Sequence, residues 1–355
     1  MRTGKLLSIV VPAYNMSDYL PKCLGSIIVD DKGLLQKLEV IVVNDGSKDR
    51  TSEIAHDFEA KYPDVFRVID KDNGNYGSCI NAALPIVSGA FVKILDADDS
   101  FDTAAFAKML QRLDESERSA EQVDLLLTDF VEVDENGSEK LLRSMQLQDG
   151  VLLAVDTIDR MPLLYMHSIA YRTENLRRLK YRQTEGVSYT DNEWTYYPMK
   201  LVRRIRYERL PVYRYLVGRA GQTMSQGVLR RSAWMVALIA RRMTENFATM
   251  ILDVPIVISK YLEDFVVMMN VKVYNLAILN VHNKEGDSAL KEFDEVLVSK
   301  AGAIHEKVMA RLVSRRIGFY YGRYWRAHKS SNTIRLCAFR GYIRMVGWMR
   351  RKLHD

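Results

Sequence analysis

Short hydrophobic runs alternate with amphipathic stretches through the first third of this chain. Four runs are rich in β-branched residues and are typical of buried strands, at residues 7–11, 40–43, 65–69 and 91–95. The stretches between them have apolar positions at helical spacing, at residues 19–29, 51–62, 78–86 and 104–113. Strands that alternate with helices predict a parallel sheet covered on both faces. We therefore expect an α/β layer sandwich of the nucleotide-binding type.

The pattern changes in the rest of the chain. Further strands are predicted at residues 123–133, 168–171, 202–207 and 212–215, with a turn at Asn136-Gly137 and a helix from about Asp191. Beyond Ser232 the apolar spacing is helical, at residues 234–251, 261–279 and 293–313. A chain of 355 residues is long enough for one large domain and an appendage. We expect the division near residue 225.

The cysteine content and the hydropathy of the sequence indicate the cellular compartment of the protein. Cys23, Cys79 and Cys337 are widely spaced and lack metal-ligand spacing, which suits a reducing environment. The first apolar run ends at Pro12, too early for a signal peptide. No window reaches the roughly 18 uninterrupted apolar residues of a spanning helix. We expect a cytoplasmic protein that does not cross a membrane.

Polar residues follow three of the four predicted strands, at residues 12–15, 44–47 and 96–99. Ligands in open α/β sheets bind at the carboxyl ends of the strands, so these segments should line one crevice. The last of them contains Asp96, Asp98 and Asp99. Divalent cations such as Mn²⁺ and Mg²⁺ prefer oxygen ligands and bridge to phosphate oxygens. The segment predicts a metal–diphosphate site, with a solvated acidic turn as the alternative.

Four motifs taken together resemble the family 2 inverting glycosyltransferases of the GT-A fold, as found in bacterial surface-polysaccharide synthesis. They lie at residues 10–15, 42–51, 72–77 and 93–100. The resemblance is close over residues 6–110 and looser to about 225. It implies a GT-A nucleotide-sugar-binding layer sandwich with a mostly parallel sheet, followed by a helical C-terminal region. The implied catalytic domain covers residues 1–225, with donor half 1–113 and acceptor half 114–225, and the helical basic region covers 226–355.

The resemblance also implies roles for the residues at the strand ends. Pro12 and Tyr14 would pack on the base and ribose of the donor, and Asp45 would accept a hydrogen bond from the base. Asp96 would contact the ribose side. Asp98 would bind the Mn²⁺ or Mg²⁺ ion that holds the diphosphate, with Asp99 assisting.

Glycine and asparagine residues after the third strand complete the implied donor site. Gly74 and Gly77 would let the backbone approach the ligand, because glycine lacks a Cβ atom. The Ala-Arg-Asn-like stretch common in the family is replaced here by residues 77–81. Asn81 is still present in this stretch and is a candidate for contact with the donor nucleotide sugar.

Asp191 matches the position of the family's catalytic carboxylate, at the start of the acceptor-side helix. Asp191 would also suit a helix N-cap, and Glu193 is the reserve candidate for the base. Asp49 and Thr51 are interpreted first as a helix start rather than as ligand contacts.

The chemistry that follows is a single displacement. The Asp191 carboxylate would remove the proton from an acceptor hydroxyl as that hydroxyl attacks the anomeric carbon, which inverts the anomeric centre. The metal would neutralise the departing nucleoside diphosphate. By resemblance the donor is a UDP-sugar, and the acceptor is a glycan or a lipid-linked glycan.

Basic and aromatic residues alternate between Arg315 and Lys352. This composition suits an anionic membrane surface, which would place the enzyme at the inner face of the membrane beside a lipid-linked acceptor. A solvated helix face or a dimer contact are alternatives, and nucleic acid is not expected as a partner because no binding motif is present. His167, Arg219 and Gln222 are left open between structural roles and contacts with the substrates.

Two other classes of protein fit parts of the pattern. A phosphatase of the haloacid dehalogenase type would use Asp96 as nucleophile and Asp98 as acid, but that signature normally opens its domain. A non-enzymatic sugar-binding protein is the other alternative, and the presence of both Asp98 and Asp191 argues against it.

Overall fold

The computed structural model describes residues 4–119, 121–143, 145–218, 226–280, 284–314 and 327–328. The chain divides into two compact units. The first comprises Met1–Ala220 and Met250–Tyr261, and the second comprises Gly221–Thr249 and Leu262–Asp355. The domain division at residue 225 stays a prediction.

Four parallel strands form the first half of the sheet, as the hydrophobic runs predict. They are β1 (Leu7–Ala13), β2 (Leu38–Asp45), β3 (Phe66–Lys71) and β4 (Phe91–Ile94). β2 is buried along its whole length, which accounts for its unbroken run of valine and isoleucine. The strand order is β3-β2-β1-β4, so the chain moves outward from β1 to β3 and then returns to the other side of β1.

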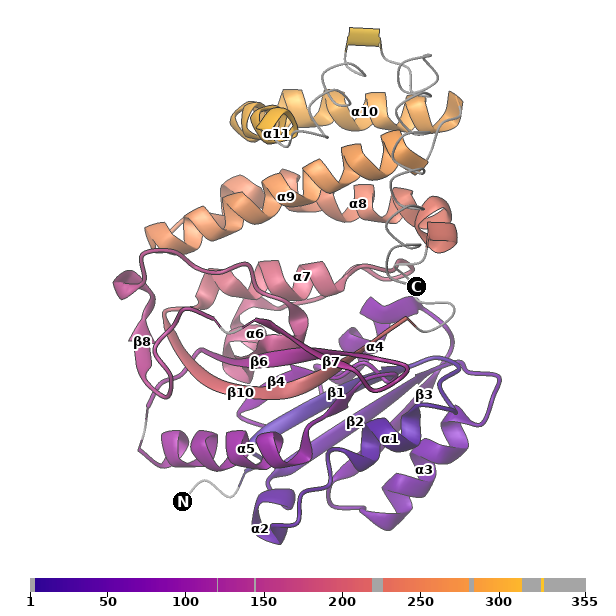
Figure 1. Cartoon of the computed structure of the whole chain (residues 1–355), viewed down its shortest axis with the longest axis vertical. Helices are drawn as coiled ribbons and strands as arrows, with labels where there is room; N and C mark the ends of the chain where they lie inside the picture. Colours follow the sequence, from indigo (N-terminus) through magenta and orange to yellow (C-terminus); the bar gives the residue numbers. More distant parts are fainter. Residues whose placement is uncertain are drawn as a thin grey trace. The chain divides into compact units, whose positions relative to one another are not determined.

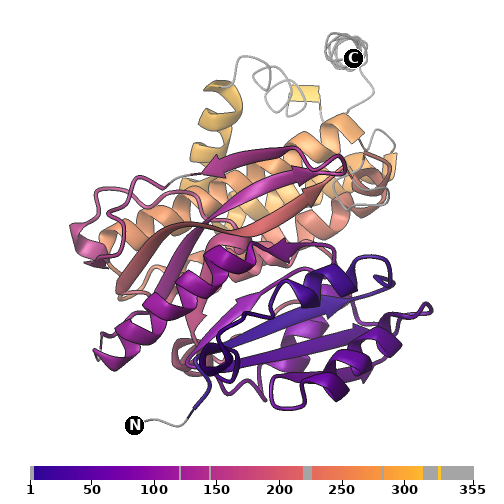
Figure 2. The same cartoon turned by 60° about the horizontal axis from the view of Figure 1, so that its bottom comes forward.

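Helices cover both faces of these strands (Figure 1), and a view turned by 60° shows the same strands from below (Figure 2). α1 (Leu20–Gly25) contacts α3 (Thr51–Lys61), whereas α4 (Asn75–Ala83) packs against β1 and β2. Right-handed crossovers put α4 on the opposite face from α1 and α3, because the chain reverses its direction across the sheet after β3. The short helix α2 (Lys32–Leu35) was not predicted, and Asp31 caps it.

The sheet continues beyond β4 with antiparallel and parallel neighbours. β9 (Ile169–Arg172) lies antiparallel between β4 and β6 (Leu125–Asp134), and β6 runs parallel to β10 (Arg204–Val217). β5 (Ser100–Phe101) and β8 (Leu152–Ala154) pair with β10. β7 (Glu139–Arg143) forms the predicted hairpin with β6, and Gly137 in its turn has a φ of 82°. Among the described residues the sheet has ten strands. The longer strands mostly run parallel to their neighbours.

The prediction of separate strands at 202–207 and 212–215 was wrong, because both belong to β10. The pairing of β10 with β6 shifts register between Glu208 and Tyr213. Pro211 lies within this irregularity and has no backbone N–H to donate to a regular ladder. The interruption of the hydrophobic alternation therefore marks a bulge within one strand.

Helices in the second half of the first unit pack against the sheet and include the helix that carries Asp191. α5 (Thr103–Arg118) packs against β10, and α6 (Thr173–Leu179) follows β9. α7 (Asp191–Tyr196) begins at the predicted residue and is anchored by the fully buried Trp194, whose ring contacts Tyr171 and Tyr181. Three short 3₁₀ helices complete the unit: η1 (Val155–Thr157), η2 (Met166–Ser168) and η3 (Tyr197–Leu201).

Helices make up the described part of the second unit, as predicted. The helices beyond residue 225 are α8 (Gln226–Met250), α9 (Ile256–Asn280), α10 (Lys284–Lys300) and α11 (Gly302–Ser314). The predicted helix at 293–313 is instead divided at Ala301, next to Gly302, a residue type that disfavours helix interiors. The buried Asn270 of α9 donates to Thr244 Oγ1 of α8 over 2.8 Å, so a polar contact joins these two helices. The basic segment 315–352 lies outside the described residues, apart from 327–328.

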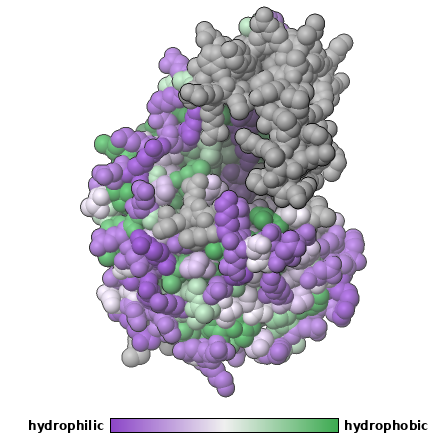
Figure 3. Space-filling model, viewed as in Figure 1, coloured by the Kyte–Doolittle hydropathy of each residue, from purple (hydrophilic) through white to green (hydrophobic). Residues whose placement is uncertain are grey.

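No helix in the described part of the chain is long and apolar enough to span a membrane. Hydrophilic residues predominate on the face that Figure 3 shows, with smaller hydrophobic areas between them. Cys23 and Cys79 are buried and free of disulfide bonds, which agrees with their interpretation as packing residues. Cys337 lies outside the described residues.

We predict that Gly89→Ala destabilises the first unit. A Cβ atom on Gly89 would lie 2.5 Å from the backbone N of Ser8, in the strand that pairs with β4. Overpacking of this kind costs about 1–3 kcal/mol of unfolding free energy. Chemical denaturation measures the effect, and Gly25→Ala is the matched control because no atom lies within 4 Å of its added Cβ. Equal stability of the two variants would contradict the packing described for β1 and β4.

Candidate active site

The strand order brings β1 and β4 side by side, and the order in which the chain adds strands to the sheet reverses between them. Ligands of open α/β sheets bind at such a reversal, beyond the carboxyl ends of the strands. Tyr14 follows β1 there, and the turn with Asp96, Asp98 and Asp99 follows β4. The predicted crevice would therefore lie at the ends of the first and fourth strands, with Asp45 at the end of neighbouring β2.

Asp99 is held by β10, which comes from a distant part of the chain. Its Oδ2 accepts a hydrogen bond from the Tyr213 hydroxyl over 2.6 Å, and its Oδ1 accepts from the Leu216 amide over 2.7 Å. Burial, together with the charges of Asp98 and Asp96, raises the pKa of Asp99 well above its usual range. The carboxylate thus fixes the acidic turn to the end of β10.

Asp96 is contacted by α4. The Tyr76 hydroxyl of α4 donates to Asp96 Oδ1 over 2.8 Å. Burial, with the charges of Asp98 and Asp191, raises the pKa of Asp96 to about 7. The charge of Asp191 also contributes to the raised pKa of Tyr76. The structure therefore brings Asp191 within electrostatic range of the acidic turn, although 95 residues separate it from Asp96 in the numbering.

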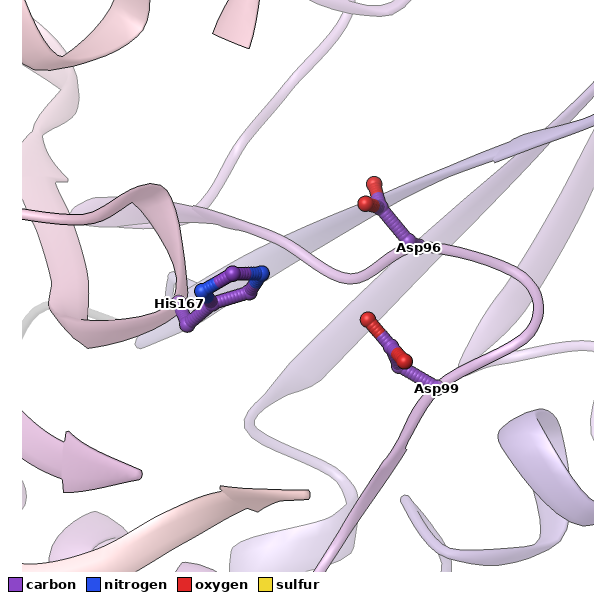
Figure 4. A group of neighbouring side chains, drawn as sticks. All are labelled: Asp96, Asp99 and His167. Carbon is purple, nitrogen blue, oxygen red and sulfur yellow. The ribbon is translucent and has the colours of Figure 1, made fainter. Parts of the chain in front are cut away.

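His167 joins the acidic turn from η2. Ligand atoms of Asp96, Asp99 and His167 all lie within 4.8 Å of one another, and the imidazole ring points toward the two carboxylates (Figure 4). The His167 Nδ1 atom is buried and has no hydrogen-bond partner among the residues that the structure describes. Burial, assisted by the charge of Lys93, lowers the pKa of His167 to about 3, so the ring is neutral. Two carboxylates and a neutral imidazole form a donor set that suits a divalent transition metal.

Lys93 supports His167 from within the sheet, a role that the sequence did not indicate. Its side chain is fully buried in β4, and its Nζ donates to the His167 carbonyl over 2.7 Å. Burial lowers the pKa of Lys93 to about 7. The only sequence signal was a lysine in an otherwise apolar strand.

The predicted base-binding residues differ in exposure. Tyr14 is 46% exposed, and Pro12 is partly buried. Asp45 is buried, and its Oδ1 accepts from Lys71 Nζ over 2.6 Å and from the Gly74 amide over 2.9 Å. One oxygen of Asp45 therefore holds the loop after β3, and the residue's contact with a base stays a prediction.

The two predicted glycines lie where protein atoms leave no room for a side chain. A Cβ atom on Gly74 would lie 2.6 Å from Ser78 Oγ, and one on Gly77 would lie 2.1 Å from the Thr184 carbonyl oxygen. Packing within the protein therefore accounts for both glycines. Their approach to a ligand stays a prediction.

The Asn81 side chain is engaged by the segment 183–185. Its Nδ2 donates to the Gln183 carbonyl over 2.9 Å and to Glu185 Oε1 over 2.7 Å, and its Oδ1 accepts from the Gln183 amide over 2.8 Å. This amide therefore joins α4 to the segment that leads toward α7. A contact of Asn81 with the donor stays a prediction.

Asp191 is the first residue of α7, and the N-cap position belongs to Thr190, which makes no capping hydrogen bond through its side chain. The interpretation of Asp191 as an N-cap was therefore wrong. Glu193, the reserve candidate, is fully buried, and its two oxygens accept from the Thr184 amide over 2.6 Å and the Thr184 hydroxyl over 2.8 Å. These contacts indicate a structural role for Glu193.

The helix-start interpretation of Asp49 is confirmed by its contacts. Asp49 Oδ1 accepts from the Thr51 amide over 3.0 Å at the start of α3, and its Oδ2 accepts from the Ser17 amide over 3.0 Å. Burial raises the pKa of Asp49, but the hydrogen bonds from Thr51 and Ser17 together outweigh it and lower the pKa to about 2. Arg219 and Gln222 lie outside the described residues.

A sheet of this topology with a carboxylate cluster at its strand ends is typical of enzymes that bind nucleotide diphosphates. The family model described as "Glycosyl transferase family 2" matches residues 8–201, more than half of the chain. The chain therefore belongs to glycosyl transferase family 2. The match includes every residue predicted for the site, from Pro12 to Asp191, and it ends before β10.

Solved structures and curated relatives agree with this assignment. Staphylococcus aureus TarS 1–349 in complex with UDP-GlcNAc is 21% identical, with a TM-score of 0.65 over 96% of this chain and 92% of that one. This likeness confirms the GT-A fold with its C-terminal helices. The uncharacterized glycosyltransferase MG025 of Mycoplasma genitalium is 36% identical over 111 residues, which are 31% of this chain and 37% of the relative. The minor teichoic acid biosynthesis protein GgaB of Bacillus subtilis is 32% identical over 108 residues, 30% of this chain and 12% of the relative.

The chain thus spans much less than two thirds of these two curated relatives. The family match agrees with the resemblance that the four motifs carry. It also decides against the phosphatase interpretation of Asp96 and Asp98.

We predict that Glu193→Gln lowers stability more than Asp191→Asn does. The amide would lose part of a buried, charge-assisted pair of hydrogen bonds with Thr184, which costs about 1–3 kcal/mol. The partly exposed Asp191 should tolerate the same change within about 0.5 kcal/mol. Thermal unfolding of the two purified variants tests this. A larger loss for Asp191→Asn would reverse the roles assigned to the two carboxylates.

Proposed function

We propose that the chain transfers a sugar, with inversion, from a UDP-sugar to a hydroxyl of a glycan or lipid-linked glycan acceptor. One observation carries the proposal. Asp191, at the start of α7, lies within electrostatic range of Asp96 in the acidic turn that follows β4. The UDP-GlcNAc complex of TarS, which shares the fold, supports a uridine nucleotide donor.

The nucleotide would lie across the ends of β1 and β2. Tyr14, with Pro12 beside it, offers a partly exposed ring for stacking on the base. The second oxygen of Asp45 would accept a hydrogen bond from the base, because the first is occupied by Lys71 and Gly74. Asp96 would face the ribose. Gly74, Gly77 and Asn81 would act mainly through the packing of α4, which would form one wall of this site.

The acidic turn would hold Mn²⁺ or Mg²⁺ with the donor. Asp98 is the ligand that the motif implies, and Asp96, Asp99 and His167 form the group whose ligand atoms lie close together. The unpartnered Nδ1 of His167 and the raised pKa values of Asp96 and Asp99 fit such an ion. When bound, the ion would neutralise charge on the departing diphosphate.

Asp191 would serve as the general base. Its carboxylate lies at the first residue of α7 and is partly exposed. The proton of the acceptor hydroxyl would pass to this carboxylate as the oxygen forms a bond to the anomeric carbon and the bond to the diphosphate breaks. Attack on the face opposite the leaving group inverts the anomeric centre.

The similarity to GgaB supports a cell-surface polymer as the acceptor. The composition of residues 315–352 supports attachment to the inner face of the membrane, where a lipid-linked acceptor would be presented. Cytoplasmic nucleotide sugars would be available at that face.

Release of UDP from a panel of UDP-sugars tests the proposal, with and without glycan acceptors. We expect Asp191→Asn to lower kcat by roughly 10²–10⁴-fold while UDP affinity is retained, because a positioned base acts mainly in the transition state. Glu193→Gln serves as the matched control and should keep a larger share of kcat. Full turnover by Asp191→Asn would reject Asp191 as the base, and phosphate release from simple phosphomonoesters would favour a phosphatase.

A further inference from the structure

Two tyrosines of β10 face the acidic turn. Tyr213 and Tyr215 are two residues apart on β10, so both side chains lie on the same face of the sheet. The His167 ring lies between them, with its centroid 4.7 Å from Tyr213 and 4.5 Å from Tyr215. Arg214, on the opposite face, is paired with Glu139 of β7. β10 therefore presents two phenols to the site, and the family match at residues 8–201 includes neither.

The two phenols are used differently. The Tyr213 hydroxyl donates to Asp99 and accepts from the Asp96 amide over 3.1 Å, so its hydrogen bonds hold the acidic turn. Within the described residues the Tyr215 hydroxyl has no hydrogen-bond partner, and its ring is fixed by stacking on His167 at an interplanar angle of 27°. Tyr215 is partly exposed. Its ring is therefore placed by packing, while its hydroxyl is available to a ligand.

The surroundings of the Tyr215 hydroxyl identify the site that it faces. After burial, the charges of Asp99, Asp96, Asp98 and Asp191 are the causes that raise the pKa of Tyr215 to about 12. All four carboxylates of the proposed site thus act on one phenol. A phenol hydroxyl can donate a hydrogen bond to an anionic oxygen.

We propose that the Tyr215 hydroxyl donates a hydrogen bond to the diphosphate of the donor nucleotide. The inference rests on the proposed function, since it assigns a residue to the leaving group of that reaction. A diphosphate enters this carboxylate-lined site together with a divalent cation, and its oxygens accept hydrogen bonds. A neutral phenol donates to them without adding a charge that would pair with Asp96 or Asp99. The contact strengthens as the bond to the anomeric carbon breaks and negative charge grows on the diphosphate.

The variant Tyr215→Phe tests the inference, because it removes the hydroxyl and keeps the ring that stacks on His167. We expect UDP affinity in Mn²⁺ to fall about tenfold to hundredfold, the range for one hydrogen bond to a charged group. Affinity for uridine, which has no phosphate, should be unchanged. Calorimetric titration measures both ligands, and UDP release gives a parallel loss in kcat/KM.

Tyr62→Phe is the matched control, since this tyrosine at the end of α3 lies away from the acidic turn and should keep wild-type affinity and rate. Thermal unfolding checks that both variants are folded. Unchanged UDP affinity in Tyr215→Phe, or an equal loss for UDP and uridine, would overturn the inference. A wild-type protein that binds no UDP would instead reject the proposed function.

Discussion

The three carboxylates at residues 96–99 impose the constraint on which the rest of the site depends. Burial and their mutual repulsion raise the pKa values of Asp96 and Asp99, so the turn is stable only where donors or cations face it. The chain supplies donors from distant segments, the Tyr76 hydroxyl to Asp96 and the Tyr213 hydroxyl to Asp99. α4 and β10 are thereby positioned around one acidic turn. The remaining negative charge would favour the divalent ion that we propose for this site.

Hydrogen bonds from side chains also connect α4 to α7 through the segment between α6 and α7. Asn81 on α4 pairs with the backbone of Gln183, and Glu193 on α7 holds Thr184 next to it. The close approach of Gly77 to Thr184 allows this arrangement. One short segment is thus bound by both helices, which places the start of α7, and with it Asp191, relative to α4.

The sequence predicted what depends on local pattern. Hydrophobic runs located β1 to β4 within a few residues, and the segment after the fourth run included the carboxylates of the acidic turn, because burial and period are visible along the chain. Long-range contacts were not predictable in this way. The roles of Lys93 and Tyr213, and the pairing of Asn81 with Gln183, depend on segments 74 to 117 residues away. The bulge at Pro211 divided one strand into two predicted ones for a similar reason, since only pairing with β6 reveals its continuity.

The central claim is that the acidic turn binds a nucleoside diphosphate through a divalent cation. Calorimetric titration of UDP into the wild-type protein and Asp98→Ala, each with and without Mn²⁺, tests it most directly. The account predicts binding that strengthens at least tenfold with Mn²⁺ in the wild-type protein and loses this dependence in Asp98→Ala. UDP binding of equal affinity in all four titrations, or none in a folded wild-type protein, would contradict it.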